Sequence, residues 1–92
     1  MAVVVMAEVL LVLSKEGHEF TYLRVKCTPK ANLENLKTRD RRFRHPSDLE
    51  RALIAAGVRG HEARAPFQVF ETGLSTFIPA SLDVARRLDL CD

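Results

Sequence analysis

A chain of 92 residues with 47% hydrophobic side chains has room for one globular domain and is too short for a two-domain enzyme. Its 14 Lys and Arg nearly balance 12 Asp and Glu, which leaves a net charge of +2. This composition lies far from the high net charge and low hydrophobicity of disordered chains. We therefore expect a single domain over residues 1–92, either α+β or all-β.

The N-terminal third predicts a β-hairpin. Residues 3–13 contain five valines and three leucines, and β-branched side chains favour a buried strand over a helix. Ser14–Gly17 has the composition of a short hairpin turn, and Phe20–Cys27 follows as the return strand.

Folding about that turn would place Val9 and Leu11 on the same face as Phe20 and Tyr22, and we expect this face to form the core. The other face is more apolar than a freely solvated sheet face, so we expect something to cover part of it. Its apolar members are Met6, Leu10, Val12, Leu23 and Val25.

The apolar start does not have the pattern of a targeting or membrane segment. No positive charge precedes it, Glu8 interrupts it, and 13 residues cannot cross a bilayer as a helix. The two cysteines, Cys27 and Cys91, are 64 positions apart and are read as reduced thiols. We expect no membrane association and a cytoplasmic location.

Residues 30–46 are predicted to form a polar connector, with one helical turn around Leu33 to Leu36. Within it, residues 37–45 read KTRDRRFRH and carry a net charge of +4, so the other 83 residues sum to −2. The positive charge of this chain is therefore a local cluster, which we call the basic segment.

A helix is predicted over residues 47–56. A capping box opens it at Ser47, Leu49 and Leu53 lie one turn apart, and Gly57 supplies a left-handed stop. Arg59–Pro66 is then predicted to be a second connector.

The four residues 57–60, Gly-Val-Arg-Gly, match the G-x-x-G loop with which KH domains clamp a nucleic-acid backbone. That use requires a helix on both sides of the loop. Only residues 61–65 precede Pro66, too few for a helix, so a helix end followed by a turn is the preferred interpretation.

The last third is predicted to contain two short strands, Phe67–Thr72 and Leu74–Ile78, and a final helix that opens at Pro79 or Ser81. Asp83 near the start of that helix can pair with Arg86 or Arg87 one turn later. The predicted fold is α+β with the order ββαββα: a two-layer sandwich in which an antiparallel sheet, led by the N-terminal hairpin, carries two helices on one face.

The candidate site is the basic segment, because clustered guanidinium groups bind phosphate and an aromatic ring can stack on a base. The alternative is a solvated loop whose arginines pair with Glu34, Asp40 or Asp48. The candidate partner-binding residues are Lys37, Arg39, Arg41, Arg42, Phe43 and Arg44.

No catalytic, cofactor or metal site is predicted. The chain contains no P-loop, G-x-S-x-G or G-x-G-x-x-G sequence. The potential metal ligands show no i,i+3, i,i+4 or C-x-x-C spacing; they are His18, His45, His61, Cys27 and Cys91.

We expect a non-catalytic interaction module that binds a protein partner or a second copy of itself, through the basic segment, the apolar sheet face or both. The alternative is a nucleic-acid-binding domain that uses the same basic segment. The third reading is a small enzyme subunit.

Overall fold

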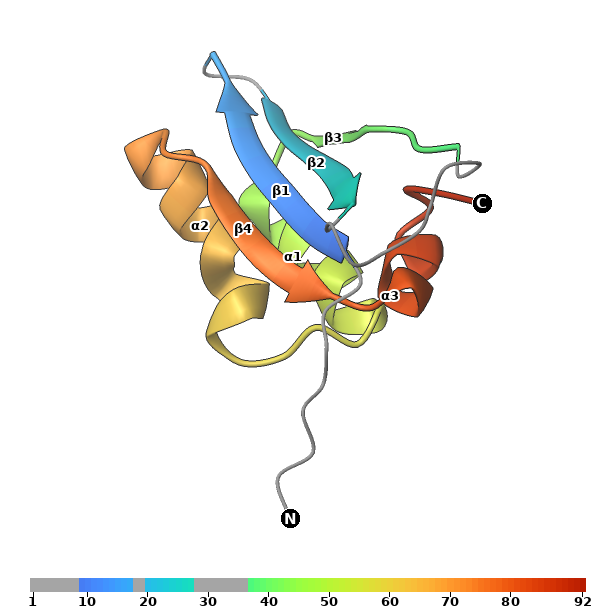
Figure 1. Ribbon diagram of the computed structural model, residues 1–92. Helices are drawn as coiled ribbons and strands as arrows, with labels where there is room; N and C mark the ends of the chain where they lie inside the picture. Colours follow the sequence, from blue (N-terminus) through green and yellow to red (C-terminus); the bar gives the residue numbers. More distant parts are fainter. Residues whose placement is uncertain (1–8, 18–19, 28–36) are drawn as a thin grey trace.

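The structure is a computed structural model that describes residues 9–17, 20–27 and 37–92, with the backbone alone for 20–27. It is an α+β fold with an antiparallel sheet, as predicted, but the chain order is βββααβα (Figure 1). The elements are β1 (Val9–Glu16), β2 (Phe20–Cys27), β3 (Arg41–Phe43), α1 (Pro46–Ala55), α2 (His61–Thr72), β4 (Thr76–Ala80) and α3 (Leu82–Arg87).

The four strands lie in the order β3-β2-β1-β4, and every neighbouring pair is antiparallel. β1 is therefore a central strand that pairs with β2 along its whole length and with β4 from Val9 to Leu13. The last strand, β4, thus returns to pair with the first one, β1 (Figure 1).

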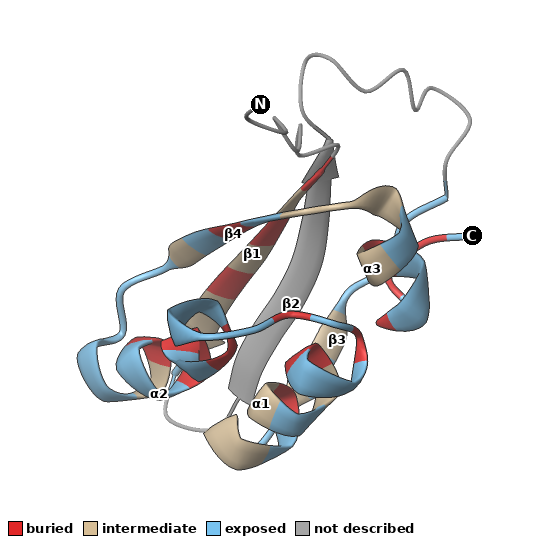
Figure 2. Cartoon of the chain, turned by 90° about the horizontal axis from the view of Figure 1, so that it is seen from below, coloured by how far each residue is buried: buried red, intermediate tan, exposed pale blue. Residues whose placement is uncertain are grey.

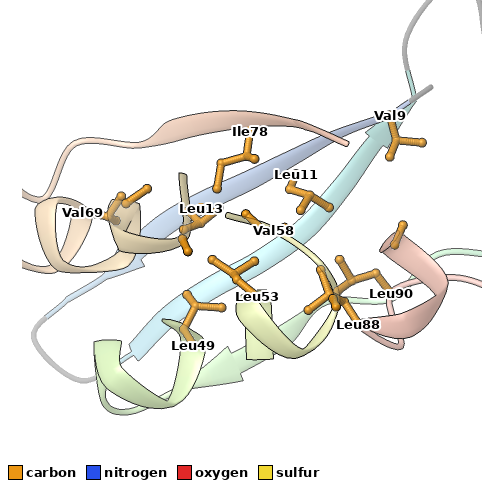
Figure 3. Packing of buried hydrophobic residues seen from close by; sticks show 14 of the residues in the cluster. Val9, Leu11, Leu13, Leu49, Leu53, Val58, Val69, Ile78, Leu88 and Leu90 are labelled. Atoms are coloured by element: carbon orange, nitrogen blue, oxygen red, sulfur yellow. The ribbon is translucent and has the colours of Figure 1, made fainter. Parts of the chain in front are cut away.

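The core lies between the sheet and the helices. Along β1, Val9, Leu11 and Leu13 are fully buried and alternate with half-buried residues, as expected for a strand with one covered face. Ile78 of β4 lies opposite Leu11 and is also buried. Helices α1 and α2 cover this face (Figure 2) and contribute Leu49, Leu53 and Val69 to the core. Val58 from the loop between them and Leu88 and Leu90 after α3 complete the cluster in Figure 3.

The hairpin is confirmed, but its predicted register is wrong. The backbone pairs Leu11 with Val25 and Tyr22 with Ser14, so Phe20 and Tyr22 are not in register with the core-facing positions of β1. The reason is that Ser14, Lys15 and Glu16 continue the strand instead of forming the turn, which shifts the pairing by an odd number of residues and so exchanges the two faces of the return strand. Residues 3–8 of the predicted strand lie outside the described residues.

Helix α1 agrees with the prediction, except at its start. The N-cap is His45, with Pro46 at the first helical position and no side-chain capping bond, so the predicted capping box at Ser47 is wrong. The end is a Schellman motif: Gly57, at φ 104°, donates to Ile54 O, and Val58 N donates to Leu53 O.

The region after Gly60 contradicts the prediction of a connector followed by a strand. Residues His61–Thr72 form helix α2, with Pro66 inside it. The alternation that suggested a strand does not describe the burial, because Val69 is buried whereas Phe67 is 41% exposed. Ala63, Pro66 and Val69 instead form a buried stripe at helical spacing, and its packing outweighs the backbone hydrogen bond that proline removes.

The last strand and helix are confirmed with small shifts. β4 begins two residues later than predicted and includes Pro79, which is tolerated because β4 is an edge strand. Ser81 caps α3 by accepting a hydrogen bond from Val84 N at 3.1 Å, and Arg87 pairs with Asp83 at 2.9 Å.

Candidate functional site

The basic segment is joined to the C-terminal residues by main-chain hydrogen bonds. Arg39 N donates to Leu90 O at 2.7 Å, and Asp92 N donates to Lys37 O at 3.3 Å, on either side of a bridge between Thr38 and Cys91. Residues 41–43 then form β3 at the edge of the sheet. The expectation of an irregular connector is therefore wrong for this part; residues 30–36 lie outside the described residues.

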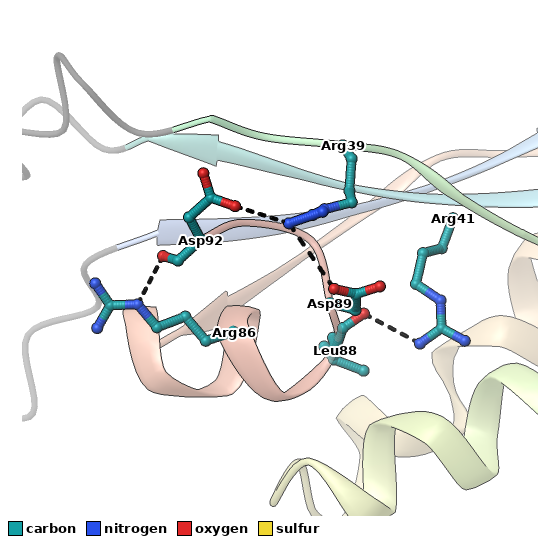
Figure 4. Close-up of polar contacts among 6 residues, drawn as sticks. All are labelled: Arg39, Arg41, Arg86, Leu88, Asp89 and Asp92. Atoms are coloured by element: carbon teal, nitrogen blue, oxygen red, sulfur yellow. Dashed lines mark hydrogen bonds and ion pairs between the residues drawn. The ribbon is translucent and has the colours of Figure 1, made fainter.

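Side chains strengthen the same junction (Figure 4). Arg39 Nη2 lies 2.9 Å from Asp92 Oδ1 and 3.9 Å from Asp89 Oδ1. From α3, Arg86 Nε donates to the carbonyl oxygen of Asp92 at 2.8 Å. The cationic group of Arg39 is thus paired with the domain's own carboxylates, although about half of its side chain is exposed (48%).

Arg41 turns inward along the same junction. Its Nη1 donates to Leu88 O at 3.0 Å, and its guanidinium lies 4.9 Å from the centroid of the Phe43 ring. Phe43 is half-buried and packs against the core. Its ring is therefore engaged by the fold and by Arg41, which argues against the predicted stacking of Phe43 on a base.

The C-terminal residues can receive these arginines because α3 ends in a second Schellman motif. Asp89, at φ 58°, donates to Arg86 O, and Leu90 N donates to Ala85 O. This turn inserts Leu88 and Leu90 into the core, where both are at most 1% exposed. The apolar anchors hold the last residues beside the basic segment.

The remaining cationic side chains of the basic segment are exposed. Lys37, Arg42 and Arg44 belong to this group, while Arg39 and Arg41 make the contacts described above. The basic segment therefore does not project into solvent as a whole, and the partner-binding role of its residues stays a prediction. Sequence reasoning missed the acceptors, Asp89 and Asp92, because only the fold brings them beside the basic segment: Asp92 is 53 positions from Arg39.

The sheet face opposite α1 and α2 offers a second candidate surface, which we call the open face. Its described members are Leu10, Val12 and Ser14 of β1, Arg42 of β3, and Phe77 and Pro79 of β4, which share alternate rows of the register. Phe77 is 56% exposed, and Leu10 and Val12 beside it are only half-buried. Leu10 and Val12 thus lie on the predicted apolar second face, but Leu23 and Val25 pair with Leu13 and Leu11 in the core-facing rows, so their predicted place on this face is wrong. Met6 lies outside the described residues, and Phe77 was not among the residues predicted for the face.

Other chemical groups are placed as follows. Cys91 is buried and forms no disulfide with a described residue. His45 and His61 are both exposed, at the starts of α1 and α2, and His18 lies outside the described residues. Within the part of the chain that the structure describes, no three His, Cys, Asp or Glu side chains gather in a way that could hold a metal ion. Of the helices in that part, none has the length and apolarity needed to cross a bilayer.

Comparison of the chain with models of known families, with curated proteins and with solved structures gave no match in any of the three.

Proposed function

We propose that this domain is a non-catalytic interaction module and that its binding surface is the open face of the sheet. The carrying observation is Phe77, a large apolar side chain that is 56% exposed beside the half-buried Val12 on a central strand. Contiguous exposed apolar area on a sheet is characteristic of a surface that a partner covers.

The size of the face favours a short segment of a partner protein over a stable dimer. The strands contribute eight, eight, three and five residues, and at roughly 16 Å² of sheet per residue the face covers roughly 400 Å². A standard protein–protein interface buries about 800 Å² on each partner. Pairing of a second copy along the β4 edge is also disfavoured, because Pro79 has no N–H to donate.

Charge indicates the chemistry of that segment. Arg42 lies in the register row of Ser14 on the open face, and Lys37 and Arg44 are exposed on either side of it along the chain. We therefore propose an occupant that combines apolar side chains with carboxylates, since opposite charges at the rim of an apolar patch speed and orient association.

The test uses a labelled peptide of alternating leucine and glutamate, with a leucine–lysine peptide as its counterpart. The acidic peptide should bind and shift amide signals of β1 and β4. Phe77→Ser should weaken this binding about tenfold, which corresponds to about 1.4 kcal/mol of lost apolar contact. Ile54→Ser is the matched control, because Ile54 is also 56% exposed but lies on α1, and it should change the affinity less than twofold.

Three results would overturn this proposal: no binding of the acidic peptide, equal loss in the two variants, or preference for the leucine–lysine peptide. Sedimentation equilibrium at high micromolar concentration tests the second copy. If the chain forms a dimer and Phe77→Ser abolishes it, the occupant of the open face is a second copy of the chain and not a peptide segment.

The nucleic-acid alternative through the basic segment is weaker, because Arg39 and Arg41 already contact the C-terminal residues. It predicts an affinity that falls steeply with salt and is lost in Arg44→Glu. A small enzyme remains the third reading, and the cytoplasmic location stays a prediction from sequence.

A further inference from the structure

The outer side of α2 contains a hollow of about 390 Å³. Among the described residues, its walls are formed by His61, Arg64, Phe67 and Gln68. These positions follow one another at helical spacing on the side of α2 that does not face the core. The hollow is therefore separate from both the open face and the basic segment.

One end of the hollow is cationic. His61 is the first residue of α2, and the Arg64 side chain is 81% exposed. Among the residues that the structure describes, Arg64 pairs with Glu50, whose Oε2 lies 4.0 Å away at the outer limit of an ion pair, so the guanidinium retains its capacity to bind another anion. The positive end of the α2 dipole has no side-chain cap and adds to the same field.

The other end of the hollow suits a planar ring. Phe67 is 41% exposed, so part of its ring is available for stacking. Gln68 carries a carboxamide, which both donates and accepts hydrogen bonds and can read the edge of a base. His61 and Gln68 are seven residues apart, which corresponds to about 10 Å along a helix. A nucleotide can span that distance with its phosphate at His61 and Arg64 and its base at Phe67 and Gln68.

From this arrangement, we propose that the hollow on α2 binds a nucleotide unit: a phosphate held by His61 and Arg64, and a base stacked on Phe67 and hydrogen-bonded by Gln68. The shared chemistry belongs to free nucleotides and to single-stranded nucleic acid. The site is independent of the proposed function, because it uses no residue of the open face.

The neighbouring loop favours single-stranded nucleic acid over a free nucleotide as the ligand of this site. Residues 57–60 connect α1 and α2, so helices flank Gly-Val-Arg-Gly on both sides, contrary to the interpretation from sequence. A Cβ built at Gly60 would meet nothing within 4 Å, and one at Gly57 would meet only Arg87 Nη1 at 3.8 Å. The loop backbone is therefore accessible beside a guanidinium, which provides a place for the next phosphate of a strand.

The experiment measures fluorescence anisotropy of labelled eight-nucleotide dT, rU and rA strands with the full chain, and calorimetric titration with AMP and UMP. Arg64→Glu should weaken binding at least tenfold. Phe67→Leu should weaken it about fivefold or more, because stacking contributes about 1–3 kcal/mol per base. Arg51→Glu is the matched control: Arg51 is 78% exposed on α1, lies 3.9 Å from Asp48, and should change affinity less than threefold.

Amide chemical shifts are measured on the unaltered protein, so a variant that fails to fold cannot affect this readout. On titration with the strands or nucleotides, the amide signals of residues 60–68 should shift. If the eight-nucleotide strands bind, AMP and UMP do not, and the variants weaken binding as stated, the site is supported and its ligand is single-stranded nucleic acid. If AMP or UMP binds with the same affinity per site as the strands, the site is supported and its ligand is a free nucleotide. Absence of binding at millimolar concentration, shifts elsewhere in the chain, or an equal loss in Arg51→Glu would overturn the proposal.

Discussion

Replacement of Arg41 by alanine tests whether the basic segment is held against the C-terminal residues. Arg41 Nη1 donates to Leu88 O at 3.0 Å, a partly buried hydrogen bond from a charged donor, and such bonds contribute about 1.5–3 kcal/mol. Its contact with the Phe43 ring at 4.9 Å adds about 0.5–1 kcal/mol. Because Arg41 is partly exposed, we take the lower part of this range and expect the free energy of unfolding to fall by about 2 kcal/mol.

The assay is urea denaturation followed by circular dichroism, with thermal unfolding as a second measure. A loss of about 2 kcal/mol in a domain of this size lowers Tm by roughly 8–16 °C. Arg51→Ala is the control, since its 3.9 Å contact with Asp48 joins exposed side chains and should contribute at most about 0.5 kcal/mol. Equal stability of Arg41→Ala and Arg51→Ala would show that the basic segment is not docked as described.

Three further substitutions test the packing and the helix ends. Leu53→Ala should reduce the free energy of unfolding by about 2.5–4 kcal/mol, because Leu53 is fully buried, whereas Ile54→Ala, next to it but 56% exposed, should cost less than about 1 kcal/mol in the same urea titration. Gly73→Ala should cost about 1 kcal/mol through backbone strain alone, because φ is 74° and the added Cβ meets nothing within 4 Å; an unchanged denaturation midpoint would contradict this. Asp89→Gly should raise the free energy of unfolding by about 0.5–1 kcal/mol, because residue 89 has φ 58°, a conformation that glycine adopts without strain. Asp89→Ala should not raise it, and thermal unfolding of the two variants shows whether each substitution stabilises or destabilises the chain.

Local signals in the sequence were sufficient for the elements whose causes are local. The leucines of α1 recur at helical spacing and Gly57 permits the left-handed turn that ends the helix, so both the element and its stop were predictable. The same holds for the hydroxyl of Ser81, which caps α3. These features depend on residues within one or two turns of each other.

Helix α2 was missed because a local rule was overruled by packing. Pro66 breaks the backbone ladder and would end most isolated helices. Here Pro66 is itself buried between Ala63 and Val69, so the stripe that packs under the sheet includes the proline. That gain comes from contacts with β1 and α1, which the sequence of residues 61–72 does not contain.

The sequence predicted that an apolar open face exists, but not all of the residues that form it. Leu10 and Val12 follow from the alternation of β1 around Val9 and Leu11. Phe77 joins them only because β4 pairs with β1 across more than sixty positions of sequence. The exposed ring that carries the proposed function is therefore a product of sheet topology.

The same distinction applies to charge, where composition predicts the number of cations but not their availability. Residues 37–45 carry +4 and residues 88–92 carry −2, so the joined segments carry +2 and the rest of the chain sums to zero. A field of that size over exposed, salt-screened side chains gives little long-range attraction for a polyanion. An anion that binds this domain must therefore be selected by local geometry, and the proposed site on α2 offers such geometry, with Arg64 beside Phe67 and Glu50 Oε2 4.0 Å from the guanidinium.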